Sequence, residues 1–209
     1  MKKLVTHSLL PSKAEASSSL GSLSAKYESS GNPGTIANTK GDLGGKSYGT
    51  YQLTVNSGHA QKFANQYGGA LKGLKVGTAA FDTAWKKEAK KNPDKFKQAQ
   101  HQYIANAHYV PALNAFSAVT GIKQVDLMPI AVRNMIWSIG VQHGAGGART
   151  IFKNSGVKSS DSWETMIKKI YAERSKVNVY FKSSPQNIKD SVYNRFQKEM
   201  NDALKQLKG

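Results

Sequence analysis

The sequence predicts a mainly α-helical fold of the α+β class, with one small β-hairpin sheet near the N-terminus. Two observations lead to this prediction. Between residues 31 and 58 the chain is rich in Gly, Thr, Asn, Ser and Tyr, which is typical of short strands joined by turns. On both sides of that segment, apolar residues recur at the three- and four-residue spacing of amphipathic helices.

The chain of 209 residues, 39% of them apolar, is long enough for one domain with a proper core, or for two lobes around a cleft. No internal repeat and no low-complexity linker separates two halves of the sequence. We therefore expect a single catalytic domain over 1–209, in which 1–57 form a helix and the hairpin and 58–209 form a helical scaffold.

The first expected helix spans 12–30, and Asn32-Pro33-Gly34 and Lys40-Gly41-Asp42 mark turns after it. The pattern is helical again from residue 58 onward. The expected helices there are 58–67, 79–91, 94–119, 129–140, 145–154, 162–180 and 186–207. The last is amphipathic, which predicts packing on the core, and contact with anionic lipid is its alternative role.

The chain carries a large excess of positive charge. Thirty Lys and Arg face thirteen Asp and Glu, for a formal net charge of +17. Such a charge attracts polyanions over a Debye length of about 8 Å at physiological salt, so nucleic acid, anionic lipid and the bacterial envelope are candidate partners. We find no zinc-finger spacing, no aromatic RNA-binding signature and no block of consecutive basic residues, which argues against nucleic acid.

Several classes of protein are excluded by what the sequence lacks. Without cysteine there is no disulfide, no thiolate nucleophile and no Cys-ligated zinc. The five histidines show no metal-ligand spacing, so we predict no metal and no cofactor. Only Leu4 and Val5 follow the N-terminal lysines before polar residues return, which predicts no signal peptide. No apolar run approaches the roughly 20 residues of a spanning helix, and we expect a soluble monomer.

Two carboxylates flank the expected hairpin. The first eighty residues contain only three acids, Glu15, Glu28 and Asp42. Hydrolysis of a glycosidic bond needs one carboxylic acid to protonate the leaving oxygen and one carboxylate to activate water or attack the anomeric carbon. Glu28, at the end of an apolar helix face, should be desolvated and keep its proton, whereas Asp42 in a glycine turn should stay ionised. The alternative is that Glu28 merely ends a helix and Asp42 merely makes a turn.

The stretches KYESSGNPG (26–34) and GDLGGKSYGTYQ (41–52) resemble the chitosanase-like peptidoglycan hydrolases of the lysozyme-like superfamily, found in phage lysins and in C-terminal domains of some secretion-system spike effectors. The resemblance is close over 24–54, and 128–148 resembles that family's second signature of a helix and a loop. It implies a lysozyme/chitosanase-like, two-lobed helical fold whose small sheet lines a sugar cleft. It also implies Glu28 as general acid, Asp42 as general base and Ser47 as the residue that holds the attacking water.

Further residues are candidates for binding substrate. Tyr48, Tyr51 and Gln52 follow on a predicted strand, where Tyr48 and Gln52 share one face and Tyr51 takes the other. Aromatic rings stack on sugars and an amide can bond N-acetyl or hydroxyl groups, while core packing is the alternative for the tyrosines. Gln142 and His143, before a glycine-rich turn in the second signature, complete the set, and orienting a neighbour is the alternative for His143.

The net charge favours peptidoglycan as substrate, because chitosan is cationic whereas peptidoglycan carries carboxylates and lies near anionic envelope polymers. We therefore predict a muramidase that hydrolyses β-1,4 linkages. The alternatives are a lytic transglycosylase, which works with one Glu, a chitosanase, and a non-catalytic module that binds cell wall or nucleic acid. The expected setting is phage lysis, in which a separate pore-forming protein releases the enzyme from the host cytoplasm. Export as an effector is the alternative.

Overall fold

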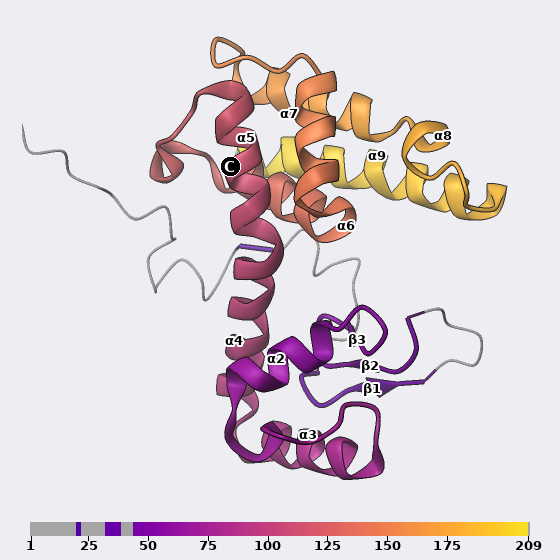
Figure 1. Ribbon diagram of the computed structural model, residues 1–209. Coiled ribbons are helices and arrows are strands. Elements are labelled where there is room, and N and C mark those ends of the chain that lie inside the picture. Colours follow the sequence, from indigo (N-terminus) through magenta and orange to yellow (C-terminus); the bar gives the residue numbers. More distant parts are fainter. Residues whose placement is uncertain (1–19, 22–31, 39–43, 209) are drawn as a thin grey trace, which may run out of the picture. The chain divides into compact units, whose positions relative to one another are not determined.

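The computed structural model describes residues 20–21, 32–38 and 44–208, and these residues form two compact units (Figure 1). The hairpin unit contains 32–38 and 44–105, and the helical unit contains 20–21 and 106–208. Helices dominate both units, and a three-stranded antiparallel sheet lies in the hairpin unit. The predicted mainly helical fold with a small sheet is therefore confirmed. The boundary between the units falls after residue 105. The single catalytic domain over 1–209, with a hairpin part to residue 57 and a helical scaffold after it, stays a prediction.

The hairpin unit combines three two-residue strands with three α-helices. Its elements are β1 (Ile36–Ala37), β2 (Ser47–Tyr48), β3 (Leu53–Thr54), α2 (His59–Tyr67), the 3-10 turn Gly69–Leu71, α3 (Ala79–Lys91) and α4 (Pro93–Ile104). The strands pair in the order β1-β2-β3, with Tyr48 opposite Ile36 on one side and Leu53 on the other. The helices match the predicted 58–67, 79–91 and the start of 94–119 within one residue.

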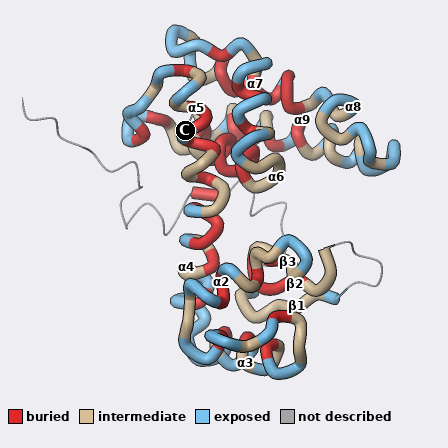
Figure 2. The backbone as a smooth tube through the Cα atoms, in the orientation of Figure 1, coloured by how far each residue is buried: buried red, intermediate tan, exposed pale blue. Residues whose placement is uncertain are grey.

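The core of the hairpin unit is aromatic. Trp85 on α3 is fully buried, and its ring lies 5.2 Å from that of Tyr48, 5.4 Å from Phe63 and 4.8 Å from Phe96, measured between centroids. The buried positions of α3 recur every four residues at Phe81, Trp85 and Ala89, which is why this helix turns one face inward (Figure 2). Large rings from the sheet and from three helices thus meet at one residue.

The two longest described helices of the helical unit are α6 (Ile130–Asn154) and α9 (Gln186–Lys208). Also in this unit are α5 (Val110–Thr120), the 3-10 turn Val125–Leu127, α7 (Trp163–Arg174) and α8 (Val177–Tyr180). Helix α5 packs along α6, and the approach is close at Gly140 of α6, where a Cβ would lie 2.8 Å from the Cβ of Ala112 on α5 and 2.6 Å from the backbone oxygen of His108 just before α5. Only glycine allows two backbones to come this near.

Two of the predicted helices, 94–119 and 162–180, differ from the structure. The helix expected over 94–119 is interrupted by a π-helical segment, Ala105–Tyr109, because Pro111 has no N–H to donate to the carbonyl four residues earlier. The break expected between 140 and 145 is confirmed as a kink at Gly144 within α6, where φ of 64° and ψ of 178° are not helical. The helix expected over 162–180 ends at Arg174, and a separate short helix follows.

The helix expected over 12–30 lies outside the described residues except at Leu20 and Gly21. These two residues form a turn instead, with φ +82° at Gly21, so the prediction is wrong at these positions. The backbone N–H of Gly21 donates to the side-chain oxygen of the fully buried Asn134 at 2.7 Å.

A buried ion pair lies at the centre of the helical unit. Arg174 on α7 and Glu199 on α9 are both completely buried, with 2.9 Å between Nη1 and Oε2. Ser138 and Arg195 also donate to the Glu199 carboxylate, at 2.8 and 2.7 Å. The Arg174 guanidinium also lies 4.0 Å from the ring centre of Phe196. Every charge that these helices bury is thus paired, as the cost of desolvating an isolated charge requires.

Candidate functional site

The two carboxylates expected to cleave the glycan, Glu28 and Asp42, lie outside the described residues. What the structure describes is the chain that follows each of them. Residues 32–38 begin four positions after Glu28, and residues 44–58 begin two positions after Asp42. Both stretches belong to the hairpin unit.

A tight turn takes the place of the strand expected over 48–52. Strand β2 ends at Tyr48, and residues 49–52 turn the chain back to β3. Gly49 has φ +75° and Gln52 has φ +49°, values that end an extended strand. The predicted strand and its alternation of faces are therefore wrong at these positions. Gly49 is also required sterically, because a Cβ there would overlap with the buried side chain of Gln100.

Ser47 and Gln52 hold this turn together. The Ser47 hydroxyl donates to Oε1 of Gln52 at 2.6 Å, and Nε2 of Gln52 donates to the carbonyl oxygen of Gly49 at 2.8 Å. Since the Ser47 proton is committed to Gln52, the Ser47 oxygen keeps its lone pairs for a further donor. Ser47 is only 5% exposed, so such a donor must be small and buried beside it.

Tyr48 lies in the core. Its side chain is fully buried, and its hydroxyl donates to Oδ1 of Asp82 at 2.6 Å and accepts from the backbone N–H of Gly77 at 3.2 Å. Lys46 completes the group, with its ammonium 2.7 Å from Oδ2 of Asp82. Burial alone would raise the pKa of Asp82, but the hydrogen bonds from Lys46 and Tyr48 outweigh it and hold this pKa below its ordinary value. Tyr48 thus has no surface to offer a sugar, and its role is to fasten β2 to α3.

Tyr51, in the 49–52 turn, is half-buried and its side chain packs against α4. Its hydroxyl is 2.6 Å from Nδ1 of His101, and the two ring centroids are 5.9 Å apart. Burial, with a smaller contribution from the charge of Lys97, lowers the pKa of His101. A neutral His101 is therefore favoured, which suits a neutral hydrogen bond to the phenol.

Gln100 connects the two stretches that follow the candidate carboxylates, and sequence reasoning missed it. Its Nε2 donates to the carbonyl oxygen of Pro33 at 3.0 Å, and its Oε1 accepts from the backbone N–H of Thr50 at 2.9 Å. Trp85 donates to the same Pro33 oxygen at 2.9 Å. Gln100 is completely buried, so one side chain of α4 fixes the distance between the 32–38 stretch and the 49–52 turn.

Gln142 and His143 lie in the helical unit, within α6 rather than in the expected loop. Oε1 of Gln142 accepts from Nη2 of Arg174 at 2.6 Å. The His143 ring lies 5.5 Å from that of Phe181 and 6.2 Å from that of Phe196, between centroids. Burial, and to a lesser degree the charge of Arg174, lowers the pKa of His143 to about 3. Both side chains take part in the packing around the buried ion pair.

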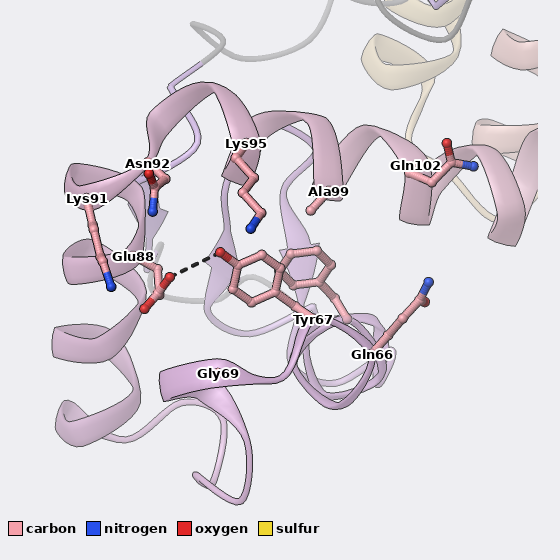
Figure 3. Close-up of a pocket in the computed structure, with 10 residues that line it drawn as sticks. Gln66, Tyr67, Gly69, Glu88, Lys91, Asn92, Lys95, Ala99 and Gln102 are labelled. Carbon is pink, nitrogen blue, oxygen red and sulfur yellow. Dashed lines mark hydrogen bonds between the residues drawn. The ribbon is translucent and has the colours of Figure 1, made fainter. Parts of the chain in front are cut away.

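A pocket of about 530 Å³ opens among α2, α3 and α4 of the hairpin unit (Figure 3). Tyr67 lies in its middle, and the Tyr67 hydroxyl donates to Oε2 of Glu88 at 3.1 Å. No motif signalled this pocket in the sequence. Elsewhere in the described part of the chain, no group of three or more His, Asp or Glu residues could hold a metal ion. No described helix is long and apolar enough to cross a membrane.

Comparison with known proteins assigns the family. A family model described as the C-terminal region of type VI secretion system spike proteins like VgrG3 matches residues 20–200. The chain belongs to this VgrG3-like family. A curated relative, the type VI secretion system spike protein VgrG3 of Vibrio cholerae serotype O1, is 36% identical over 136 residues. These residues are 64% of this chain and 13% of the relative, so the chain corresponds to a small part of a much longer protein.

The VgrG3-like match includes both stretches that carry the resemblance in sequence, 24–54 and 128–148. All candidate residues, from Glu28 to His143, therefore lie within the family's boundaries. The likeness to spike proteins of secretion systems is confirmed at this level, and it favours an exported effector over a phage lysin as the setting.

Proposed function

We propose that this chain is the glycan-cleaving region of a secretion-system spike, a glycosidase that hydrolyses β-1,4 linkages of bacterial peptidoglycan. Glu28 is the general acid and Asp42 the general base. The observation that carries the proposal is the Ser47–Gln52 hydrogen bond five residues after Asp42, which fixes a serine oxygen as an acceptor beside the turn. Membership of a spike-protein family that covers both acids supports the same function.

The mechanism needs one water molecule held in a defined orientation. One hydrogen of that water bonds to Asp42, which removes it as the oxygen attacks the anomeric carbon, and the other hydrogen bonds to the Ser47 oxygen. Ser47 can accept this bond because its own proton is donated to Gln52. Glu28 gives its proton to the leaving glycosidic oxygen. Over the reaction Glu28 therefore loses one proton and Asp42 gains one.

Gln100 supports this arrangement as a positioning residue. General acid–base catalysis requires the two groups to stay at a fixed separation, because misplacement by about 1 Å can lower a rate 100-fold. Gln100 donates to Pro33 and accepts from Thr50, and these two hydrogen bonds join the stretch after Glu28 to the turn after Asp42. A buried amide on a helix is a rigid tie for two segments that have little secondary structure of their own.

Charge supports peptidoglycan as the substrate and the bacterial envelope as the place of action. The net charge of +17 concentrates the protein near anionic envelope polymers, and salt should weaken that attraction. A spike protein's C-terminal region would reach this polymer by export through the secretion system. Peptidoglycan strands and anionic envelope polymers are therefore the proposed partners, with no metal or cofactor in the reaction.

Clearing of a peptidoglycan suspension tests the proposal. We expect Glu28→Gln and Asp42→Asn each to lower the clearing rate by about 10²- to 10⁴-fold, the contribution typical of a general acid or base. The matched control is Asp94→Asn, which removes an exposed carboxylate of α4 and should leave the rate unchanged. Parent protein that sediments with peptidoglycan without clearing it would instead be a binding module, and the enzymatic proposal would fall.

The products distinguish hydrolysis from transglycosylation. Hydrolysis through Asp42 leaves a free reducing end, whereas a lytic transglycosylase leaves a 1,6-anhydro sugar and needs only Glu28. Mass spectrometry of the digest separates the two by the mass of one water. Anhydro products from the parent protein, together with full activity of Asp42→Asn, would exclude the proposed hydrolysis.

A further inference from the structure

The pocket of the hairpin unit contains the chemical groups of a sugar site. Tyr67 and Gln66 come from the last turn of α2, Glu88 and Lys91 from the last turns of α3, and Lys95 from α4. In Figure 3 the Tyr67 ring lies between Glu88 and Lys91 on one side and Gln66 on the other. The volume of the pocket, about 530 Å³, lies within the range of about 300–1,000 Å³ that is typical of small-ligand pockets.

Tyr67 is held so that its ring can support a ligand. It stacks on the buried Phe63, with centroids 5.6 Å apart and an angle of 22° between the rings, and its hydroxyl is bonded to Glu88. Burial and this bond to Glu88 raise the pKa of Tyr67, so the phenol stays a neutral donor. A fixed, half-buried aromatic ring with a carboxylate and amides around it is suited to a ligand with an apolar face and hydroxyl groups at its edge.

The two lysines add a preference for negative charge. Neither Lys91 nor Lys95 forms an ion pair within the described part of the chain, although Glu88 lines the same pocket. Two ammonium groups against one carboxylate leave one positive charge in excess. A single carboxylate neutralises this excess, whereas a doubly charged phosphate would overcompensate it and costs more to desolvate, so the balance favours a ligand with one carboxylate.

We propose that this pocket binds an N-acetylated sugar that carries a carboxylate, with Tyr67 under the sugar ring and Lys91 and Lys95 at the carboxylate. In peptidoglycan this is the muramyl unit, whose lactyl group or attached peptide supplies the acid. The inference rests on the proposed function for its biological meaning, because it names the part of the glycan that the hairpin unit holds. The site itself is defined by its lining and can be tested without any cleavage.

Two small sugars that differ by one group are the probes. N-acetylmuramic acid carries a lactyl carboxylate that N-acetylglucosamine lacks, and backbone amide signals of Gly69 and Ala99, both in the pocket wall, report binding by NMR titration. We expect both sugars to shift these signals, with N-acetylmuramic acid binding about tenfold more tightly, since tenfold corresponds to about 1.4 kcal/mol, within reach of two exposed ion pairs. Inorganic phosphate should compete weakly.

A double variant tests the role of the lysines. In Lys91→Gln/Lys95→Gln, the affinity for N-acetylmuramic acid should fall about tenfold, to that of N-acetylglucosamine, while the affinity for the neutral sugar stays unchanged. The matched control, Lys87→Gln/Lys97→Gln, removes the same charge from the same two helices at exposed positions outside the pocket. It should retain the preference for the acid.

Three results would overturn the pocket proposal: no shift of these signals at millimolar sugar, an equal loss in both double variants, or displacement of the sugar by phosphate at equal concentration. None of these bears on Glu28 and Asp42, whose test is the clearing of peptidoglycan. Conversely, a parent protein that binds N-acetylmuramic acid in this pocket but never cleaves peptidoglycan would refute the proposed hydrolysis and leave the pocket standing.

Discussion

The two units of this chain differ in how far each buries one ion pair. In the helical unit, Arg174 and Glu199 are both fully buried and find all their charged partners within the packing of three helices. In the hairpin unit, the comparable pair Lys46 and Asp82 keeps 20% and 24% of its side chains exposed. The hairpin unit also contains the pocket around Tyr67. The difference indicates where charge stabilises the fold and where polar groups stay accessible for binding.

The energetic reason lies in the cost of desolvation. A fully buried charge pair must be completely satisfied, because removing one partner leaves the other without water, which typically costs about 3–5 kcal/mol. An exposed pair is worth about 0–1 kcal/mol and can exchange its partner for a ligand at little cost. Breaking the buried ion pair of the helical unit should therefore lower stability strongly, whereas removing an exposed charge of the hairpin unit should change binding more than stability.

The largest expected effect comes from Arg174→Leu, which leaves Glu199 buried with fewer donors. We expect the free energy of unfolding to fall by about 3 kcal/mol, near the lower end of the usual range because Arg195 still contacts the carboxylate. Urea denaturation measures this change. Arg149→Leu, at an exposed position of α6, is the control and should change stability by less than about 0.5 kcal/mol.

The double variant Arg174→Leu/Glu199→Leu sharpens the same prediction. With both charges replaced by apolar groups no carboxylate is left buried and unpaired, so much of the lost stability should return. Stability lower than that of Arg174→Leu alone would show that shape, and not the uncompensated charge, determines the effect.

Gln100→Leu should separate stability from activity. It removes the bonds to Pro33 and Thr50, and we expect a loss of about 1–3 kcal/mol in the free energy of unfolding. The rate of peptidoglycan clearing per folded molecule should fall by at least about tenfold, because the two stretches lose their tie. Gln98→Leu, an exposed neighbour on α4, should change neither. A rate that tracks the folded fraction alone would make Gln100 purely structural.

The sequence predicts local features of both units well. Helices α2, α3 and α9 begin and end within one residue of the predicted bounds, since their apolar spacing and their flanking Gly, Thr and Pro residues act over a few positions. The turn at 49–52 was missed because Thr50 and Tyr51 are residue types typical of a strand, whereas Gly49 has φ +75° and has no room for a Cβ beside Gln100. Such a constraint comes from a residue fifty positions away.

The long-range polar contacts could not be paired from sequence, but their members left a local signal. Gln100 occupies the inward face of α4 between Phe96 and Tyr103, where an apolar residue is the norm, and Glu199 similarly lies between Phe196 and Ala203 on α9. A polar side chain on an apolar stripe predicts a buried hydrogen bond. The identity of its partner depends on how helices pack, which spacing along one helix does not contain.

A smaller effect is expected for Tyr48→Phe, which removes one hydroxyl and keeps the aromatic packing against Phe81 and Trp85. Asp82 loses a donor but keeps Lys46, so the free energy of unfolding should fall by about 1 kcal/mol. Tyr193→Phe, on a residue that is 45% exposed, is the control and should be silent. An equal change in both variants would contradict the view that the Tyr48 hydroxyl fastens β2 to α3.

The smallest effect is a pH dependence carried by His143 in the helical unit. Its pKa is lowered from 6.5 to about 3 by burial and by Arg174, and the aromatic rings of Tyr180, Phe181 and Phe196 surround it. As the pH falls below 6.5, His143 therefore takes up a proton in the unfolded chain but stays neutral in the folded chain. The stability contributed by neutral His143 is complete above that pH and is lost as the pH falls toward 3.

Comparing the parent with His143→Gln isolates this contribution, because His59 and His101, whose pKa values are also lowered, are common to both. Between about pH 6.5 and about pH 5.5, where few carboxylates titrate, the parent should lose up to about 1 kcal/mol more than the variant. Thermal denaturation across this window measures the difference. Parallel curves for the two proteins would mean that His143 accepts a proton in the folded state, and that the helical unit is more open to water beside Arg174 than its packing indicates.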